Sequence, residues 1–167
     1  MKIELYPKEK VTFDGRALSF GMSREDAEVL LGTGVPVGDR VYYFQNEVAV
    51  SYGVNGVEFV EFLGGLDGCL KLSVYGASVF ETEAEALVAL LREKNGAAKE
   101  RTENGFGYTF YGLGVGLYRE AIPEDVEEMI REAASFGNPM SDEEIAYEMA
   151  KANRFATIGI AAPEYYK

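Results

Sequence analysis

The side chains in this sequence that could do chemistry are carboxylates and tyrosines, because histidine is absent and cysteine occurs once, as Cys69. Without histidine, Ser-His-Asp and Cys-His catalysis are excluded, and so is a zinc site built from Cys and His. Glu58 and Glu61 lie on one expected strand, with Glu47 on its neighbour. Paired carboxylates can serve acid–base catalysis or bind a hard cation, but no Asp-x-Asp or calcium-loop spacing accompanies these three. We interpret them as exposed sheet residues, and we expect no catalytic residue, no metal and no cofactor.

The charge of the chain disfavours nucleic acid as a partner and suits a basic protein. Twenty-eight acidic residues face sixteen basic ones, for a formal net charge of −12, whereas nucleic-acid binding relies on clustered Lys and Arg. Seven acids crowd two expected helices near the C-terminus: Glu124, Asp125, Glu127, Glu128, Asp142, Glu143 and Glu144. Acids at a helix start complement the helix dipole, which is a purely structural explanation. The alternative is an electrostatic landing surface for a basic protein, with association that salt weakens.

A run of alternating glycines is the second candidate site. Strict alternation between Tyr108 and Tyr118 places one set of residues on the same face of an expected strand: Phe110, Gly112, Gly114, Gly116 and Tyr118. A glycine lane lets another backbone, a helix or an aromatic ring approach closely. Either the protein's own C-terminal helix or aromatic tail covers this lane, or a small ligand binds along it. It is not a phosphate loop, because no Lys-Ser or Lys-Thr follows it.

Tyrosine is the third feature, with eleven residues in the chain. Seven fall on expected strands: Tyr42, Tyr43, Tyr52, Tyr75, Tyr108, Tyr111 and Tyr118. Tyrosine is a good strand residue, and it is also a good interface residue because it is amphipathic and has few rotamers. Some of these side chains must be exposed, so both interpretations stay open.

The elements that position these residues begin with an antiparallel meander. Four strands are expected in succession, at Arg40–Phe44, Glu47–Tyr52, Val57–Leu63 and Cys69–Tyr75. Asn55-Gly56 between the second and third is a strong hairpin signal. Leu70, Leu72 and Val74 alternate with polar residues, as in a half-buried strand that needs helices on its apolar face.

Four helices are expected around this meander. Ser23 caps the first, which ends at Gly32 and leaves Arg24, Glu25 and Glu28 facing water. Thr82 caps the second, which runs to Lys94. The third opens at Ile122-Pro123, and the fourth is capped by Ser141. A final strand is expected from Phe155 to Ile160.

These elements predict an α+β fold in a single domain, residues 1–167. A capped helix followed by strands occurs twice, in residues 18–76 and 80–120, so the chain reads as two tandem helix-plus-sheet units that form one longer antiparallel sheet. Residues 121–167 supply C-terminal helices, packed on one face, and the last strand. The apolar share of 47% is enough for a substantial core. No apolar run reaches membrane-spanning length and the N-terminus lacks a signal-peptide core, so we expect a cytoplasmic protein.

Two segments resemble known families. Phe20 to Gly32 reads Phe-Gly-Met-Ser-Arg-Glu-Asp-Ala-Glu-Val-Leu-Leu-Gly and resembles the first helix of beta-lactamase-inhibitor-protein-like and SmpA/BamE-like domains. The resemblance implies a short helix on an antiparallel sheet, a unit that the inhibitor duplicates, although members of those families are usually exported. Arg154 to Ile160, with Tyr165-Tyr166, is similar to the ends of small cytoplasmic bacterial proteins, some encoded beside toxins as immunity proteins, and implies a non-enzymatic binder.

The sequence therefore predicts a non-catalytic protein of the immunity or inhibitor type. It would bind a protein partner, such as a basic toxin or effector, through an acidic, tyrosine-bearing surface, with no nucleic acid and no membrane. A small-ligand-binding domain that uses the glycine lane is the alternative. Exposed sheet edges are compatible with a monomer or a homodimer.

Overall fold

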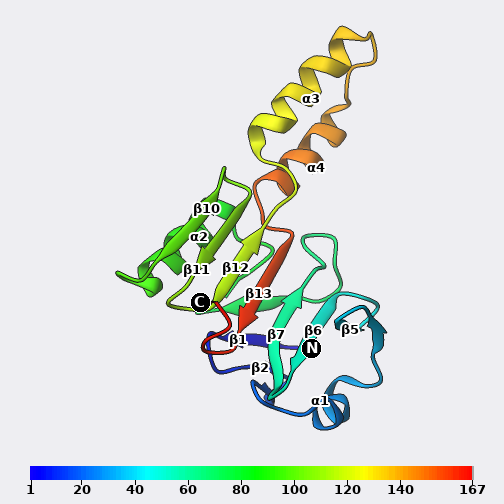
Figure 1. Cartoon of the computed structure of the whole chain (residues 1–167). Helices are drawn as coiled ribbons and strands as arrows, with labels where there is room; N and C mark the ends of the chain where they lie inside the picture. Colours follow the sequence, from blue (N-terminus) through cyan, green and yellow to red (C-terminus); the bar gives the residue numbers. More distant parts are fainter. Residues whose placement is uncertain (167) are drawn as a thin grey trace.

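The protein is built on two sheets, seen in a computed structural model that describes residues 1–166 (Figure 1). The smaller sheet has the order β3-β2-β1-β8-β9, and the larger has the order β10-β11-β12-β13-β7-β6-β5-β4. The strands of the smaller sheet are β1 (Ile3–Tyr6), β2 (Lys10–Phe13), β3 (Arg16–Ser19), β8 (Leu72–Val74) and β9 (Ala77–Ser78). Those of the larger sheet are β4 (Val35–Val37), β5 (Arg40–Tyr43), β6 (Val48–Gly53), β7 (Gly56–Phe62), β10 (Glu100–Glu103), β11 (Gly107–Phe110), β12 (Val115–Tyr118) and β13 (Thr157–Ala161).

The last strand joins the two halves of the larger sheet. β13 pairs with β12 on one side and with β7 on the other, so that Ile158 lies opposite both Leu117 and Phe62 (Figure 1). The strands of residues 18–76 and of residues 80–120 that belong to this sheet therefore flank β13. They form the one longer sheet that tandem units would make, while the repeat itself stays a prediction.

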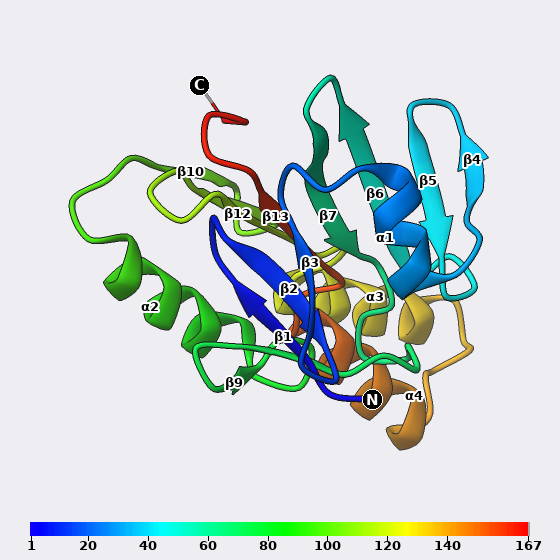
Figure 2. The same cartoon turned by 90° about the horizontal axis from the view of Figure 1, so that it is seen from below.

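One face of the larger sheet carries the core. Phe62 packs near Phe13 of the smaller sheet, with ring centroids 6.3 Å apart. Leu31 of α1 (Arg24–Leu31) and Leu87 of α2 (Ala84–Asn95) belong to the same buried cluster. Figure 2 shows α2, the first strands of the smaller sheet and α1 side by side along the larger sheet. Because Ile158 and Ile160 point into this core, Gly159 between them faces the opposite side of the sheet.

The fourth strand of the predicted meander belongs to the other sheet. β8 begins at Leu72 rather than Cys69, and it pairs in parallel with β1, so that Ile3 lies opposite Leu72. The Glu47 carboxylate accepts hydrogen bonds from the backbone amides of Cys69 and Leu70, at 3.0 and 3.1 Å. These two amides are therefore used in a loop rather than in a strand ladder. The other three strands pair in the expected order.

Two helix starts show how local and tertiary contacts compete. Ser23 caps α1 as predicted, and its hydroxyl accepts from the amide of Asp26 at 3.1 Å. Thr82 does not cap α2, because the helix begins one residue later and its Glu83 cap position makes no side-chain hydrogen bond. The amide of Ala84 instead donates to the carbonyl of Asn153 at 2.6 Å, a partner 69 positions away that the local pattern could not reveal.

The C-terminal helices are α3 (Pro123–Ser135) and α4 (Asp142–Ala152). The α+β class with antiparallel pairing and helices at the C-terminus is confirmed, but the placement of these helices differs from the prediction. They form a hairpin that extends beyond the end of the larger sheet instead of covering a face (Figure 1). The face that they would cover is occupied by the smaller sheet, α1 and α2, so the two helices pack mainly on each other. Among the helices of residues 1–166, none combines the length and apolar character needed to cross a membrane.

Candidate functional site

The hairpin of α3 and α4 is the first candidate site, and its ends are fixed by local sequence. The amide of Ile122 donates to the Asp125 carboxylate at 3.0 Å, and Pro123 follows at the first helical position. Gly137, with φ of +75°, turns the chain after α3. Ser141 then caps α4, accepting from the amide of Glu144 at 3.1 Å. Both helices are thus held by their own caps rather than by a surrounding core.

The hairpin holds more than half of the excess negative charge. Residues 123–152 contain nine acids and two bases, a net charge of −7, which leaves −5 for the other 137 residues of the chain. Of the seven acids predicted to form a landing surface, Asp125 caps α3 and is half-buried. The other six are exposed: Glu124, Glu127, Glu128, Asp142, Glu143 and Glu144. The hairpin therefore gathers the predicted residues on one projecting element.

A small set of polar contacts attaches the hairpin to the rest of the protein. Buried Arg119 donates from Nη1 to the carbonyl of Ala152 at 2.8 Å and from Nε to the carbonyl of Gly105 at 2.9 Å. Its guanidinium lies 5.5 Å from the ring centroid of Phe155. The Tyr147 hydroxyl donates to the Asp67 carboxylate, on the loop after β7. The base of α4 is thus tied to the sheet, while the distal end extends away from it (Figure 1).

The second candidate site, the glycine lane, is not a single strand face. Phe110 is fully buried in the core, on the opposite side of the sheet from Tyr118. Gly112 and Gly114 lie in the turn before β12, where the amide of Gly112 donates to Asn95 Oδ1 at 2.8 Å. The predicted placement of these residues on one strand face is wrong, because β11 and β12 are two strands joined by a turn at residues 111–114 and not one continuous strand. Only Gly116 and Tyr118 reach the face opposite the core, where the Tyr166 hydroxyl would lie 3.1 Å from a Cβ atom on Gly116.

The glycine floor on that face comes from two strands. Gly116 of β12 lies opposite Gly159 of β13, and Gly159 was not among the predicted site residues. A Cβ atom on Gly159 would lie 2.3 Å from the Phe59 ring, so this ring covers the glycine. Tyr165 stacks on Phe59 with centroids 5.0 Å apart. The aromatic tail therefore covers part of the floor, as one of the two interpretations predicted.

The space left on this face is small. A hollow of about 160 Å³ remains beside Gly116, Gly159 and Tyr118, below the range of about 300–1,000 Å³ that is usual for small-molecule sites. A larger hollow of about 480 Å³ lies between the β6–β7 turn and the tail, lined by Gly21 and by residues 54–58 and 162–165. Glu58 and Glu164 are its carboxylates. A ligand site on this face stays a prediction. Its glycines are Gly116 and Gly159, not the predicted set of Gly112, Gly114 and Gly116.

The carboxylates of Glu47, Glu58 and Glu61 do not converge on one site. Glu61 pairs with Arg40 at 2.8 Å, and Glu47 is engaged by two backbone amides. In residues 1–166 there is no group of three or more Cys, Asp or Glu side chains that could hold a metal ion. These carboxylates therefore hold the sheet and a loop in place rather than form a common site.

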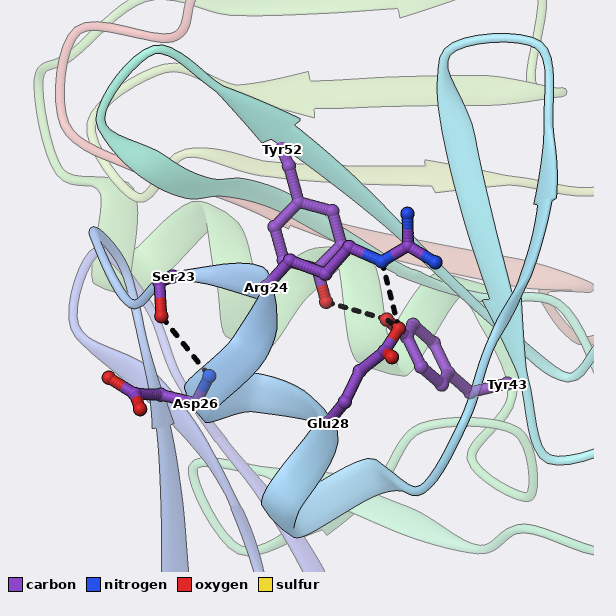
Figure 3. Close-up of polar contacts among 6 residues, drawn as sticks. All are labelled: Ser23, Arg24, Asp26, Glu28, Tyr43 and Tyr52. Atoms are coloured by element: carbon purple, nitrogen blue, oxygen red, sulfur yellow. Dashed lines mark hydrogen bonds and ion pairs between the residues drawn. The ribbon is translucent and has the colours of Figure 1, made fainter.

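A polar cluster between α1 and the larger sheet was not predicted (Figure 3). Glu28 accepts from the Tyr43 hydroxyl at 2.8 Å and from Arg24 Nε at 2.9 Å, so it does not simply face water. The hydroxyls of Tyr43 and Tyr52 are 2.7 Å apart. Burial raises the pKa of Tyr43 and that of Tyr52, which keeps both phenols protonated, while the hydrogen bonds from Arg24 and then Tyr43 lower the pKa of Glu28. Each polar group here has a partner within the cluster, which suits anchoring of α1 better than acid–base chemistry.

No protein-family model, no curated protein and no solved structure matches this chain. The candidate site accordingly rests on the geometry and charge of the residues themselves.

Proposed function

We propose that this protein is a non-catalytic, cytoplasmic binding protein of the immunity or inhibitor type. Its α3–α4 hairpin would dock on a basic protein partner and block that partner's working surface. The observation that carries the proposal is the concentration of charge: residues 123–152 hold a net −7 of the total −12, on an element that extends from the body (Figure 1).

The physics of such a surface favours fast and selective encounter. A dense patch of one sign raises the association rate with an oppositely charged protein and repels partners of the same sign. In residues 1–166 none of the five ion pairs involves a hairpin side chain. The hairpin acids are therefore available to an external cation without first breaking an internal pair.

Co-expression with the proteins encoded beside this gene tests the proposal. The triple variant Glu124→Lys, Glu127→Lys and Glu128→Lys changes the charge of the hairpin by +6. The matched control, Glu25→Lys, Glu85→Lys and Glu93→Lys, makes the same change at exposed positions of α1 and α2. We expect the hairpin variant to weaken the complex by about 100-fold and the control by less than about fivefold, since each tenfold step corresponds to 1.4 kcal/mol.

Salt dependence provides the second readout. The affinity of the wild-type complex should fall steadily as ionic strength rises, mainly through a slower association rate. The proposal would be contradicted by a complex whose affinity does not change with ionic strength, or whose affinity falls equally in the two triple variants. The absence of any complex with a protein partner would also contradict it.

A further inference from the structure

The hairpin also exposes apolar surface on α3. Met129 is 41% exposed and Phe136, just after the last turn, is 85% exposed. Ile122, at the cap, is half-buried. These three residues are spaced by seven, which places them nearly in line along the helix. None of the three is fully buried, whereas Val126 of α3 and Ala152 of α4 are.

Acidic side chains run beside this apolar line. Asp125 and Glu132 are also seven residues apart, and Glu128 lies between them on the same flank of α3. Glu128 and Glu132 are exposed. A row of apolar groups next to a parallel row of carboxylates matches a helix whose apolar row is flanked by Lys or Arg.

We propose that α3 receives a basic amphipathic helix of the partner, which completes a three-helix bundle with α3 and α4. The partner helix packs apolar side chains on Met129 and Phe136, and its cations face Glu128 and Glu132. This inference rests on the proposed function and adds the structural class of the segment that is recognised.

Charge selects this occupant over a second copy of the chain. Two hairpins that packed together would bring net charges of −7 and −7 into contact, and like charges that face each other in an interface oppose association. A basic helix gains attraction at the same acids. The same argument disfavours an anionic lipid surface, which would be repelled by the hairpin.

Synthetic helices test the inference without knowledge of the natural partner. The probe is a fluorescent Leu/Lys peptide of about three heptads with one apolar stripe. One control peptide has the same composition in scrambled order, and the other replaces every Lys by Glu. We expect measurable binding of the Leu/Lys helix only, with at least about tenfold weaker binding of either control peptide.

Variants of the protein locate the contact. The double variant Met129→Ser and Phe136→Ser should reduce affinity for the Leu/Lys helix by at least about tenfold, as expected for loss of two apolar contacts. The control is Val29→Ser and Val54→Ser, which removes two exposed apolar side chains from the rest of the protein (76% and 104% exposed) and should change affinity less than about twofold. Circular dichroism checks that both variants remain folded.

Several outcomes overturn the inference. Equal binding of the scrambled peptide would show charge attraction without helix docking, and unchanged affinity of the Met129→Ser and Phe136→Ser variant would remove the site. Self-association of the wild type in sedimentation equilibrium, abolished by that variant, would assign the surface to a second copy instead. In a natural complex, loss of binding on charge reversal but not on the Ser substitutions would leave the proposed function intact and refute only the helix.

Discussion

The body of the protein, meaning the described residues outside the hairpin of residues 123–152, uses the same residue types as the hairpin in opposite ways. In the body, a single buried cluster runs through both sheets, α1 and α2, and its acids are partly neutralised, as in the pairs Arg24–Glu28, Arg40–Glu61 and Arg92–Glu100. In residues 123–152, only Val126 and Ala152 are fully buried, and the net charge is −7. Burial stabilises the body, whereas the hairpin leaves its charged and apolar groups accessible. The hairpin is therefore the element with the least internal stabilisation, and it is the element for which we propose a binding role.

The largest expected difference between the two regions is in the cost of truncation. Phe62 is buried between the sheets and next to β13, so Phe62→Ala should lower the free energy of unfolding by about 3–5 kcal/mol. Met129→Ala, at a position 41% exposed, should cost less than about 1 kcal/mol. Urea unfolding of the two variants measures both values. Similar costs would show that the hairpin is as well packed as the body.

The second largest effect on stability is expected at Arg119, which joins the hairpin to the body. Arg119 bonds the carbonyls of Ala152 and Gly105 from a buried position. Arg119→Met keeps the apolar stem but leaves both carbonyls without this donor, at a cost of about 2–3 kcal/mol. We expect amide hydrogen exchange to accelerate in α3 and α4 while β6 and β7 change little. Uniform acceleration throughout the sheet would show that hairpin and body unfold as one unit.

What the sequence could predict follows the same division. Local chemistry predicted the caps of α1 and α4 at Ser23 and Ser141 and the three paired strands of the meander. Long-range partners were out of reach. The pairing of β8 with β1, and the Asn153 carbonyl that replaces a Thr82 cap, join residues about 70 positions apart.

The candidate site shows the same limit. The acids of the hairpin could be predicted because they cluster at two helix starts, and a helix start is recognised from neighbouring residues in the sequence. The C-terminal helices were expected to pack on one face of the sheet, and nothing in residues 121–167 revealed that the smaller sheet would occupy that face. Gly159 was missed because its partnership with Gly116 depends on strand register. Its position between Ile158 and Ile160 was the available signal that it faces away from the core.

The smallest expected effect is the pH response of a body carboxylate, Glu28. The hydrogen bonds from Arg24 and Tyr43 lower its pKa below the ordinary value of 4.5. A carboxyl whose pKa is lower in the folded state stabilises the fold above the ordinary pKa, and this contribution is lost as pH falls through the folded pKa. Glu28→Gln should therefore be slightly less stable than the wild type at neutral pH, with the difference shrinking below about pH 4.5. Urea midpoints between neutral and acidic pH measure this, with the exposed Glu25→Gln as the control. A difference that stays constant with pH would mean that ionisation of Glu28 does not contribute to the stability of the fold.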